Sequence, residues 1–169
     1  MNCLVIFFLF LYNLVLFDAQ NAKDITVKLC TKELARIKAP VYLKKHKETL
    51  NKYTMIIYVD KNDCPSCFIS HLSEWDILIK ECGEKEIPMG FMFIFSPLEK
   101  DNNAFVVSLA SSSISYFSYI DLENKFRRNN PWLAKNHSMH IFIVDEHMKP
   151  TFIDAPPYDR RFMTWLQSL

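Results

Sequence analysis

The sequence predicts an α/β fold, with a central, mostly parallel sheet and helices on both of its faces. From residue 54 onwards, short apolar segments rich in β-branched and aromatic residues alternate with amphipathic segments. Alternation of strands with helices is typical of parallel sheets. The last two predicted strands are joined by residues 146–150 alone, which is short enough for an antiparallel hairpin at one edge. With 169 residues, the chain is long enough for one domain of this kind.

Five segments are predicted to be strands, because each is a short apolar run bounded by polar or turn-forming residues. They are residues 54–60, 91–95, 116–120, 139–145 and 151–154. Ahead of them, residues 24–38 show weak helical spacing that Pro40 should end, and residues 41–43 are a candidate short strand.

Helices are predicted between the strands. The clearest covers residues 65–82, where apolar residues recur at spacings of three and four, and Gly83 is expected to end it. Its stripe consists of Phe68, Leu72, Trp75, Ile79 and Cys82. Shorter helices are expected over residues 104–110 and 122–128. A C-terminal helix is expected to have Pro157 near its first position.

The N-terminus carries an apolar run, LVIFFLFLYNLVLF, over residues 4–17. It is shorter than the roughly 20 residues of a membrane span and matches the apolar core of a secretory signal. An uncleaved anchor and a buried helix are the alternatives. We expect residues 1–22 to be a signal peptide or N-terminal membrane anchor, residues 23–50 an N-terminal extension and residues 51–169 the folded domain.

Composition excludes two classes of function. Lys and Arg number 20 against 19 Asp and Glu, for a net charge of +1, so nucleic acid is not an expected partner. The chain has 2 glycines, and they are isolated. It therefore contains neither a GxGxxG fingerprint nor a Walker A loop, and no cofactor is predicted.

The strongest chemical motif is Cys64-Pro65-Ser66-Cys67, which follows the first apolar strand and opens the helix predicted over residues 65–82. A thiol at a helix start is favoured as the thiolate, and a second thiol three residues on lies one helical turn away. This placement favours Cys64 as nucleophile and Cys67 as resolving thiol. Asp63 should oppose thiolate formation, whereas Lys61 should favour it.

Other interpretations of the cysteines differ in strength. Haem attachment requires CxxCH, and Phe68 stands in the histidine position. A zinc site from Cys64, Cys67, His71 and Cys82 fails on length, since Cys82 is nearly four helical turns beyond Cys67. A structural disulfide or idle thiols at the motif, and a Cys30–Cys82 disulfide, stay open. His71 is expected at the exposed rim of its helix.

Taken together, these motifs resemble the thioredoxin-like superfamily, in its branch of TlpA-type and peroxiredoxin-like exported thiol–disulfide proteins. The resemblance rests on YVDKNDCPSCFISHLSEW, FMFIFSP, YFSYIDLENKFRRNN and MHIFIVDEHMKPTFI, in that order, over residues 50–168. It implies a thioredoxin-like domain over residues 51–169. It also implies catalysis by Cys64 and Cys67, protein thiols or disulfides as substrates, a further redox partner, and a bacterial periplasm or cell envelope as location.

One position departs from that family. The family has a cis-proline ahead of the closing hairpin, and this slot falls near Met139, where no proline stands. A cis peptide without proline costs about 3 kcal/mol, so the trans form is expected. By their positions beside the two cysteines and in this slot, the expected active-site neighbours are Asp63, Pro65, Ser66 and Met139. The alternative function is a non-catalytic envelope protein that binds a partner and keeps a structural CxxC disulfide.

Overall fold

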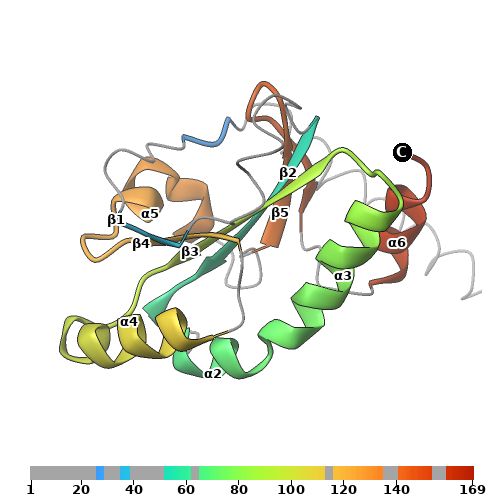
Figure 1. Ribbon diagram of the computed structural model, residues 1–169. Coiled ribbons are helices and arrows are strands. Elements are labelled where there is room, and N and C mark those ends of the chain that lie inside the picture. Colours follow the sequence, from blue (N-terminus) through green and yellow to red (C-terminus); the bar gives the residue numbers. More distant parts are fainter. Residues whose placement is uncertain are drawn as a thin grey trace, which may run out of the picture.

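The structure is a computed structural model, which describes residues 26–28, 35–38, 52–61, 65–112, 116–134, 141–153 and 159–169. Strands and helices alternate in it as the sequence predicts (Figure 1). The elements in chain order are β1 (Ala35–Lys38), β2 (Tyr53–Val59), α2 (Pro65–Ser70), α3 (Leu72–Glu84), β3 (Met89–Phe95), the 3-10 turn η4 (Glu99–Asp101), α4 (Asn102–Ser111), β4 (Phe117–Ile120), α5 (Lys125–Asn129), the 3-10 turn η5 (Pro131–Ala134), β5 (Ile141–Asp145), β6 (Pro150–Ile153) and α6 (Arg160–Leu166).

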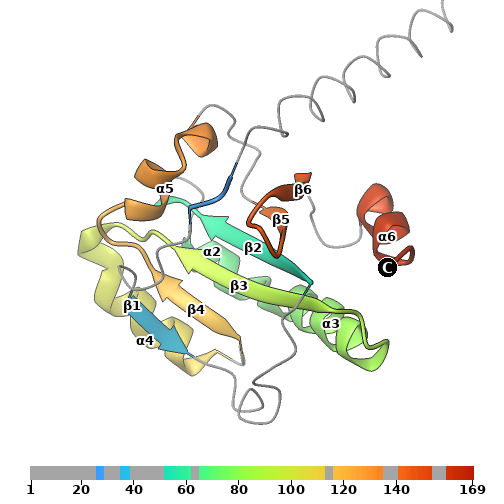
Figure 2. The same ribbon diagram turned by 90° about the horizontal axis from the view of Figure 1, so that it is seen from above.

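The strands form one 6-stranded sheet in the order β1-β4-β3-β2-β5-β6 (Figure 2). At its centre, β2 pairs in parallel with β3, and β3 pairs in parallel with β4. On the other side of β2, β5 and β6 run antiparallel as the predicted hairpin. The α/β fold class is confirmed, and the three parallel strands at the centre give the sheet a shared carboxyl edge.

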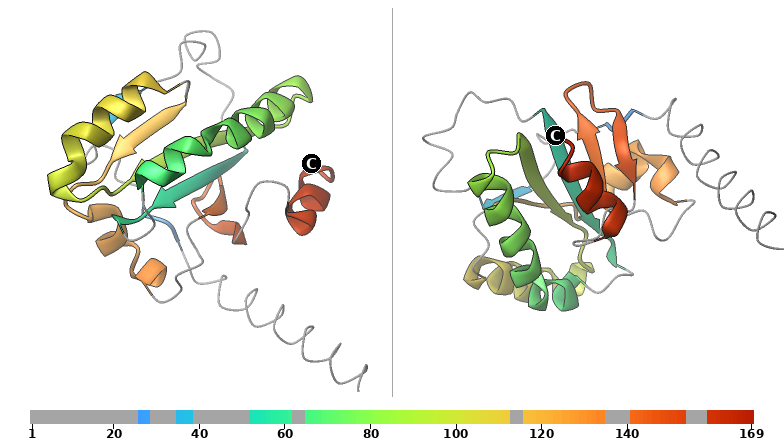
Figure 3. Two further views of the ribbon diagram at one scale, coloured as in Figure 1. Left: turned by 90° about the horizontal axis from the view of Figure 1, so that it is seen from below. Right: turned by 90° about the vertical axis from the view of Figure 1, so that its right-hand side faces the viewer.

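Helices cover both faces of the sheet, as expected. Helices α3, α4 and α6 pack on one face through Trp75, Leu78, Phe105 and Phe162, among others. The views in Figure 3 show this layer on a single side of the sheet. The opposite face is covered by α5 and η5, which contribute Phe126 and Leu133 to a second apolar cluster. The central strand β2 lies between the two layers, and its residues from Met55 to Val59 are at most 3% exposed.

The segment ahead of β2 differs from the prediction. Residues 24–38 show weak helical spacing, but the described residues at the end of this segment, 35–38, form the strand β1. β1 pairs antiparallel with β4, with Ala35 opposite Ile120. Val27, 2% exposed, lies in the second apolar cluster. A four-residue strand at an edge takes its hydrogen bonds from its neighbour, so its own apolar spacing is a weak signal.

The helix predicted over residues 65–82 is interrupted. His71, at φ −100° and ψ 7°, separates α2 from α3. The helix also passes through Gly83 and ends at Glu84, so the prediction of Gly83 as its C-cap is wrong. A Cβ built on Gly83 would have nothing within 4 Å, and the left-handed turn beyond the helix falls on Glu86, with φ 54°. Backbone bonds therefore set this helix end without a glycine.

The last helix begins later than expected. Its first residue is Arg160, and Asp159 is the N-cap, accepting hydrogen bonds from the backbone N–H groups of Arg161 at 2.9 Å and Phe162 at 3.1 Å. Pro157 is thus not near the first helical position, and it lies outside the described residues. An aspartate N-cap outweighs the proline signal here because it satisfies two helix N–H groups.

The β5–β6 hairpin turns without glycine, as the sequence requires. Met148 takes the left-handed conformation with φ 60°. Asp145 Oδ1 accepts the backbone N–H groups of His147 at 2.8 Å and Lys149 at 2.9 Å. Such an Asx turn holds a tight connection that glycine would otherwise provide.

In the part of the chain that the structure describes, no helix is both long and apolar enough to cross a bilayer. The apolar run over residues 4–17 lies outside that part, so the expected division into residues 1–22, 23–50 and 51–169 stays a prediction.

Candidate active site

The predicted redox motif lies where the carboxyl end of β2 leads into a helix. Strand β2 ends at Val59, Asp60 and Lys61 follow, and α2 begins at Pro65. Pro65 is therefore the first helical residue, where its missing N–H costs nothing. Asp63, Cys64 and Met139 lie outside the described residues, and for Pro65, Ser66 and Cys67 the structure describes the helical backbone and not the side chains.

The resemblance implies a strand–CxxC–helix–strand unit, followed by an inserted strand and helix and a closing hairpin with a final helix. The observed order contains each part: β2, α2 with α3, and β3; then β4 and α5; then β5, β6 and α6. The parallel β2–β3 pair and the antiparallel β2–β5–β6 hairpin have the implied directions. The chain has a thioredoxin-like fold.

Comparison with solved structures gives weak similarities. Yeast Sco1 with copper bound matches at a TM-score of 0.49 and 15% identity, covering 80% of this chain and 85% of that one. The exposed lipoprotein thioredoxin Etrx1 of Streptococcus pneumoniae matches at a TM-score of 0.46 and 14% identity, covering 73% of this chain and 89% of that one. A thioredoxin-like protein of Bacteroides caccae matches at a TM-score of 0.46 and 15% identity. The match covers 69% of this chain and only 40% of that protein.

No protein-family model matches the chain, and no curated protein sequence matches it. The structural similarities are weak, so they assign no function to this chain.

Polar residues follow each of the three parallel strands of the thioredoxin-like fold at their shared carboxyl edge. Asp60 follows β2, Ser96 follows β3 and Asp121 follows β4, and each is at most 2% exposed. Backbone bonds extend the sheet to them: Ser96 N–H donates to Val59 O at 2.9 Å, and Asp121 N–H donates to Phe95 O at 2.8 Å. In parallel α/β sheets this edge is where binding sites form.

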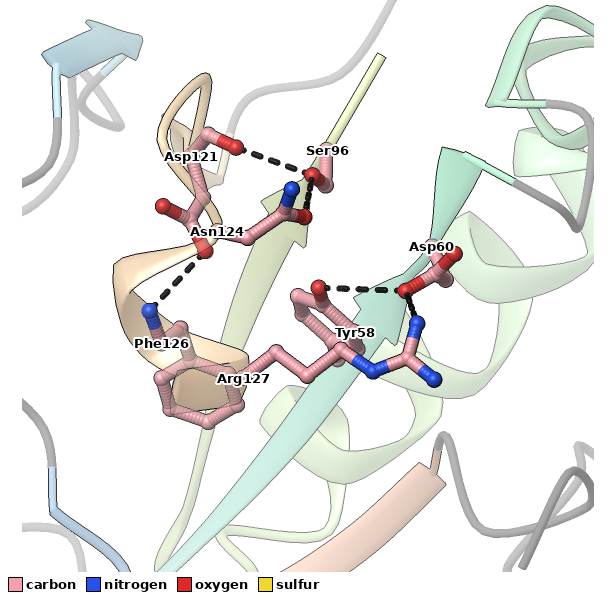
Figure 4. Close-up of polar contacts among 7 residues, drawn as sticks. All are labelled: Tyr58, Asp60, Ser96, Asp121, Asn124, Phe126 and Arg127. Carbon is pink, nitrogen blue, oxygen red and sulfur yellow. Dashed lines mark hydrogen bonds and ion pairs between the residues drawn. The ribbon is translucent and has the colours of Figure 1, made fainter. Parts of the chain in front are cut away.

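Two side chains among the described residues contact Asp60 (Figure 4). Arg127 of α5 reaches across to pair with its carboxylate, and the Tyr58 hydroxyl donates to Asp60 Oδ2 at 3.4 Å. Burial raises the pKa of Tyr58 above its ordinary value of 10.0, and the nearby carboxylates of Asp60 and Asp121 raise it further. Tyr58 is therefore a neutral hydrogen-bond donor beside a buried ion pair, and it does not supply a phenolate.

Asp121 fixes the start of α5. Its carboxylate accepts the backbone N–H groups of Lys125 at 2.7 Å and Phe126 at 2.9 Å. Burial is the largest influence and raises the pKa of Asp121 despite those two bonds. Asn124 takes a left-handed conformation with φ 52°, and Ser96 Oγ lies 2.7 Å from its Oδ1 (Figure 4). The ends of β3 and β4 thus position α5.

A cavity of about 330 Å³ lies beside this cluster. It is lined by Lys61, Asn124, Arg127, Arg128 and Pro131. Three of these five residues are cationic, and Lys61 is three positions before Cys64 in the sequence. Of these five lining residues, only Lys61 was singled out in the sequence as a residue that influences the motif.

Sequence reasoning missed Asp60, Arg127 and Ser96 as site residues. Asp60 and Arg127 are 67 positions apart, so no local spacing connects them. A usable signal was nevertheless present, because each buried strand is followed at once by a polar residue at the end where parallel strands meet.

The structure also describes two other residues that the sequence had singled out. His71 is exposed, with 68% of its side chain accessible and Nδ1 3.3 Å from Glu74 Oε1, so its prediction as a rim residue is confirmed. Cys82, 1% exposed, is a free thiol in the core, so the Cys30–Cys82 disulfide is not formed in this structure. Burial raises the pKa of Cys82 to about 11, which makes it unreactive. Among the described side chains, no group of three or more His, Cys, Asp or Glu is placed to hold a metal.

Proposed function

We propose that the protein is a thiol–disulfide oxidoreductase that exchanges disulfides with protein thiols through Cys64 and Cys67. The observation that carries this proposal is the position of Pro65 as the first residue of α2, directly beyond the carboxyl edge of a buried parallel strand. A CxxC at such a strand–helix junction within a βαβ unit is the arrangement that redox thiol pairs use.

In this reaction the Cys64 thiolate attacks one sulfur of a substrate disulfide. The substrate S–S bond breaks, a mixed disulfide forms, and the other substrate sulfur leaves as a thiolate that takes a proton from water. The Cys67 thiolate then attacks Cys64 Sγ, which releases the second substrate thiol. The substrate gains two electrons, and the protein becomes the Cys64–Cys67 disulfide. The same steps in reverse oxidise a dithiol substrate, and a second protein dithiol or disulfide restores the starting state.

Of the charges beside the motif in the sequence, Lys61 favours a reactive thiol and Asp63 opposes it. Lys61 precedes Cys64 by three residues, and a nearby cation lowers a thiol pKa. Asp60, four residues before Cys64, would have the opposite effect, but Arg127 compensates its carboxylate. We include Asp63, Ser66 and Met139 in the proposal as active-site neighbours, since they flank the thiols or occupy the slot of the family's cis-proline.

The proposed setting is outside the cytoplasm, in a bacterial periplasm or cell envelope. The apolar run over residues 4–17 supports export or anchoring. Fractionation of cells that express the full chain would test this. Recovery of the protein in the cytoplasmic fraction would contradict it.

The catalytic proposal is tested with cysteine variants in dithiol-dependent reduction of a protein disulfide. Cys64→Ser should abolish turnover, and Cys67→Ser should trap a mixed disulfide that non-reducing electrophoresis detects. Cys82→Ser is the matched control, because its thiol is buried away from solvent, and it should keep wild-type turnover.

The alternative, a structural CxxC in a partner-binding protein, is motivated by the missing proline near Met139. Its signature is a reduction potential for the Cys64–Cys67 pair far below about −300 mV, measured against a glutathione series. That potential, together with wild-type turnover in both motif variants, would refute the oxidoreductase proposal.

A further inference from the structure

The cationic cavity beside the motif has no role in the thiol exchange itself. Its lining comes from two places: Lys61 from the segment that leads from β2 to Cys64, and the other four residues from α5 and its two ends. Asn124 precedes α5, Arg127 and Arg128 form its last turn, and Pro131 begins η5. The cavity thus lies between the motif segment and the helix inserted after β4.

The charge of this cavity is compensated in part. Arg127 pairs with the buried Asp60, but within the described part of the chain no acidic side chain forms an ion pair with Lys61 or Arg128. Asp121, the other buried carboxylate at this edge, accepts two backbone N–H groups of α5 and also interacts electrostatically with Arg128. Lys61 and Arg128, which are both exposed, are therefore the cations of the cavity that an anion can reach.

Two of the lining residues are held in place by buried groups. Arg127 is fixed by Asp60, and Asn124 is fixed by Ser96, and both of these partners are at most 2% exposed. A group that is already positioned loses less entropy when a ligand binds. Arg127 and Asn124 are therefore preorganised, and the exposed Lys61 and Arg128 supply the cations that have no ion pair among the described residues.

Its distance from the reacting thiol is limited by the chain. Cys64 is three positions after Lys61, and a fully extended chain spans at most about 3.6 Å per residue, so the two Cα atoms are within about 11 Å of each other. A substrate peptide covers the same distance with about three residues. An anionic side chain a few positions from the substrate cysteine could thus enter the cavity while that cysteine reacts.

We propose that the cavity lined by Lys61, Asn124, Arg127 and Arg128 binds the carboxylate of an acidic residue close to the substrate cysteine, so that the protein selects acidic peptides. This inference rests on the proposed thiol exchange. Carboxylates are the anionic side chains that peptide substrates carry, and guanidinium groups bind them through paired N–H donors. Attraction by such a site raises association rates by roughly 10-fold or more at low salt.

The experiment compares three disulfide-linked peptides that are identical except for the second and third residues from the cysteine, which are Glu, Gln or Lys. For the wild type we expect the rate constant of reduction to be about tenfold higher for the Glu peptide than for the Gln peptide, with the Lys peptide slowest. The preference should shrink as ionic strength rises. Equal rates for the Glu and Gln peptides would overturn the proposal and leave the thiol exchange intact.

Variants then locate the preference. Arg128→Glu should abolish or reverse it. Lys61→Glu should do the same and should also slow the reaction with all three peptides, because it replaces the cation that precedes Cys64 by a carboxylate. Lys80→Glu makes the same change of charge on α3, where the side chain is 77% exposed and outside the cavity, and it should keep the preference. Loss of the preference in Lys80→Glu to the same degree would overturn the assignment to the cavity.

A binding measurement separates the two proposals. Peptides with serine in place of cysteine cannot react, and their affinity for the Cys64→Ser variant is measured by fluorescence anisotropy. If the Glu peptide binds more tightly and Arg128→Glu removes that difference, the cavity binds carboxylates. This conclusion holds even if the protein turns over no disulfide. Equal binding of the Glu and Gln peptides refutes it.

Discussion

Replacement of Arg127 by leucine should destabilise the protein, because it removes the cation that faces the buried Asp60. The Asp60 side chain is 2% exposed and the Arg127 side chain 26% exposed, so water reaches the pair from the arginine side only. Tyr58 remains as a hydrogen-bond donor to the carboxylate. Hydrogen bonds to charged groups are worth about 1.5–3 kcal/mol. We therefore expect a loss of about 2 kcal/mol in the free energy of unfolding.

The matched control is the adjacent residue of the same helix. Arg128 has an exposed side chain and no ion pair in the described part of the chain, and both arginines lie in the last turn of α5. Arg128→Leu should change the free energy of unfolding by about 0.5 kcal/mol or less. The difference between the two variants isolates the contact with Asp60 from the loss of a cation at a helix end.

The assay is urea denaturation followed by intrinsic fluorescence, with melting temperatures as a second measure. For a chain of this size, 2 kcal/mol corresponds to a drop in Tm of roughly 4–8 °C. A double-mutant cycle with Asp60→Asn should give a coupling energy above 0.5 kcal/mol. Equal destabilisation by Arg127→Leu and Arg128→Leu, or an additive cycle, would refute the role of the buried pair.

Three further predictions concern single side chains. Asn130 is 1% exposed and bonds both the N–H and the C=O of Lys28, so Asn130→Ala should cost about 2 kcal/mol and speed amide hydrogen exchange at Lys28; unchanged exchange would contradict this. Burial raises the pKa of Cys82 from 9.0 to about 11. As pH rises, the thiol therefore ionises first in the unfolded state, and the free energy of unfolding should fall between pH 9 and 11. Cys82→Ala should flatten that fall, and an unchanged slope would refute the prediction. Asp159→Ala should lower the free energy of unfolding by about 1 kcal/mol at pH 7, because it removes the N-cap bonds. The pKa of Asp159 is lowered, chiefly by the Phe162 N–H, so this difference should vanish as pH falls through that lowered pKa. Asp101, an N-cap without a side-chain bond, is the control, and an equal loss in Asp101→Ala would contradict the capping argument.

The sequence predicted the elements whose burial is two-sided or strongly periodic. Strand β2 is apolar from Met55 to Val59 because both faces are covered, and this continuous run locates the strand. Helix α3 is evident from the stripe that includes Leu72, Trp75 and Ile79, all buried. The hairpin follows from two apolar runs that are close in the sequence.

Elements defined by distant partners were not predictable from local pattern. Strand β1 exists because β4 offers an unpaired edge, about 80 residues further along the chain. The end of α3 passes Gly83, since the left-handed residue that turns the chain is Glu86. Likewise, the candidate site combines the motif predicted from CxxC spacing with Asp60 and Arg127, whose contact only the three-dimensional fold creates.

The position of α5 depends on polar contacts as well as on apolar packing. It has five residues, of which Phe126 is buried, and so short a helix has little stability of its own. Asp121 holds its start, Asp60 holds Arg127 in its last turn, and Asn130 beyond its end binds the N-terminal segment at Lys28. The same helix carries two of the three cations of the cavity. Any change that weakens these buried polar bonds should therefore lower stability and also displace the charges next to the proposed nucleophile, so the two effects are physically linked at this edge of the sheet.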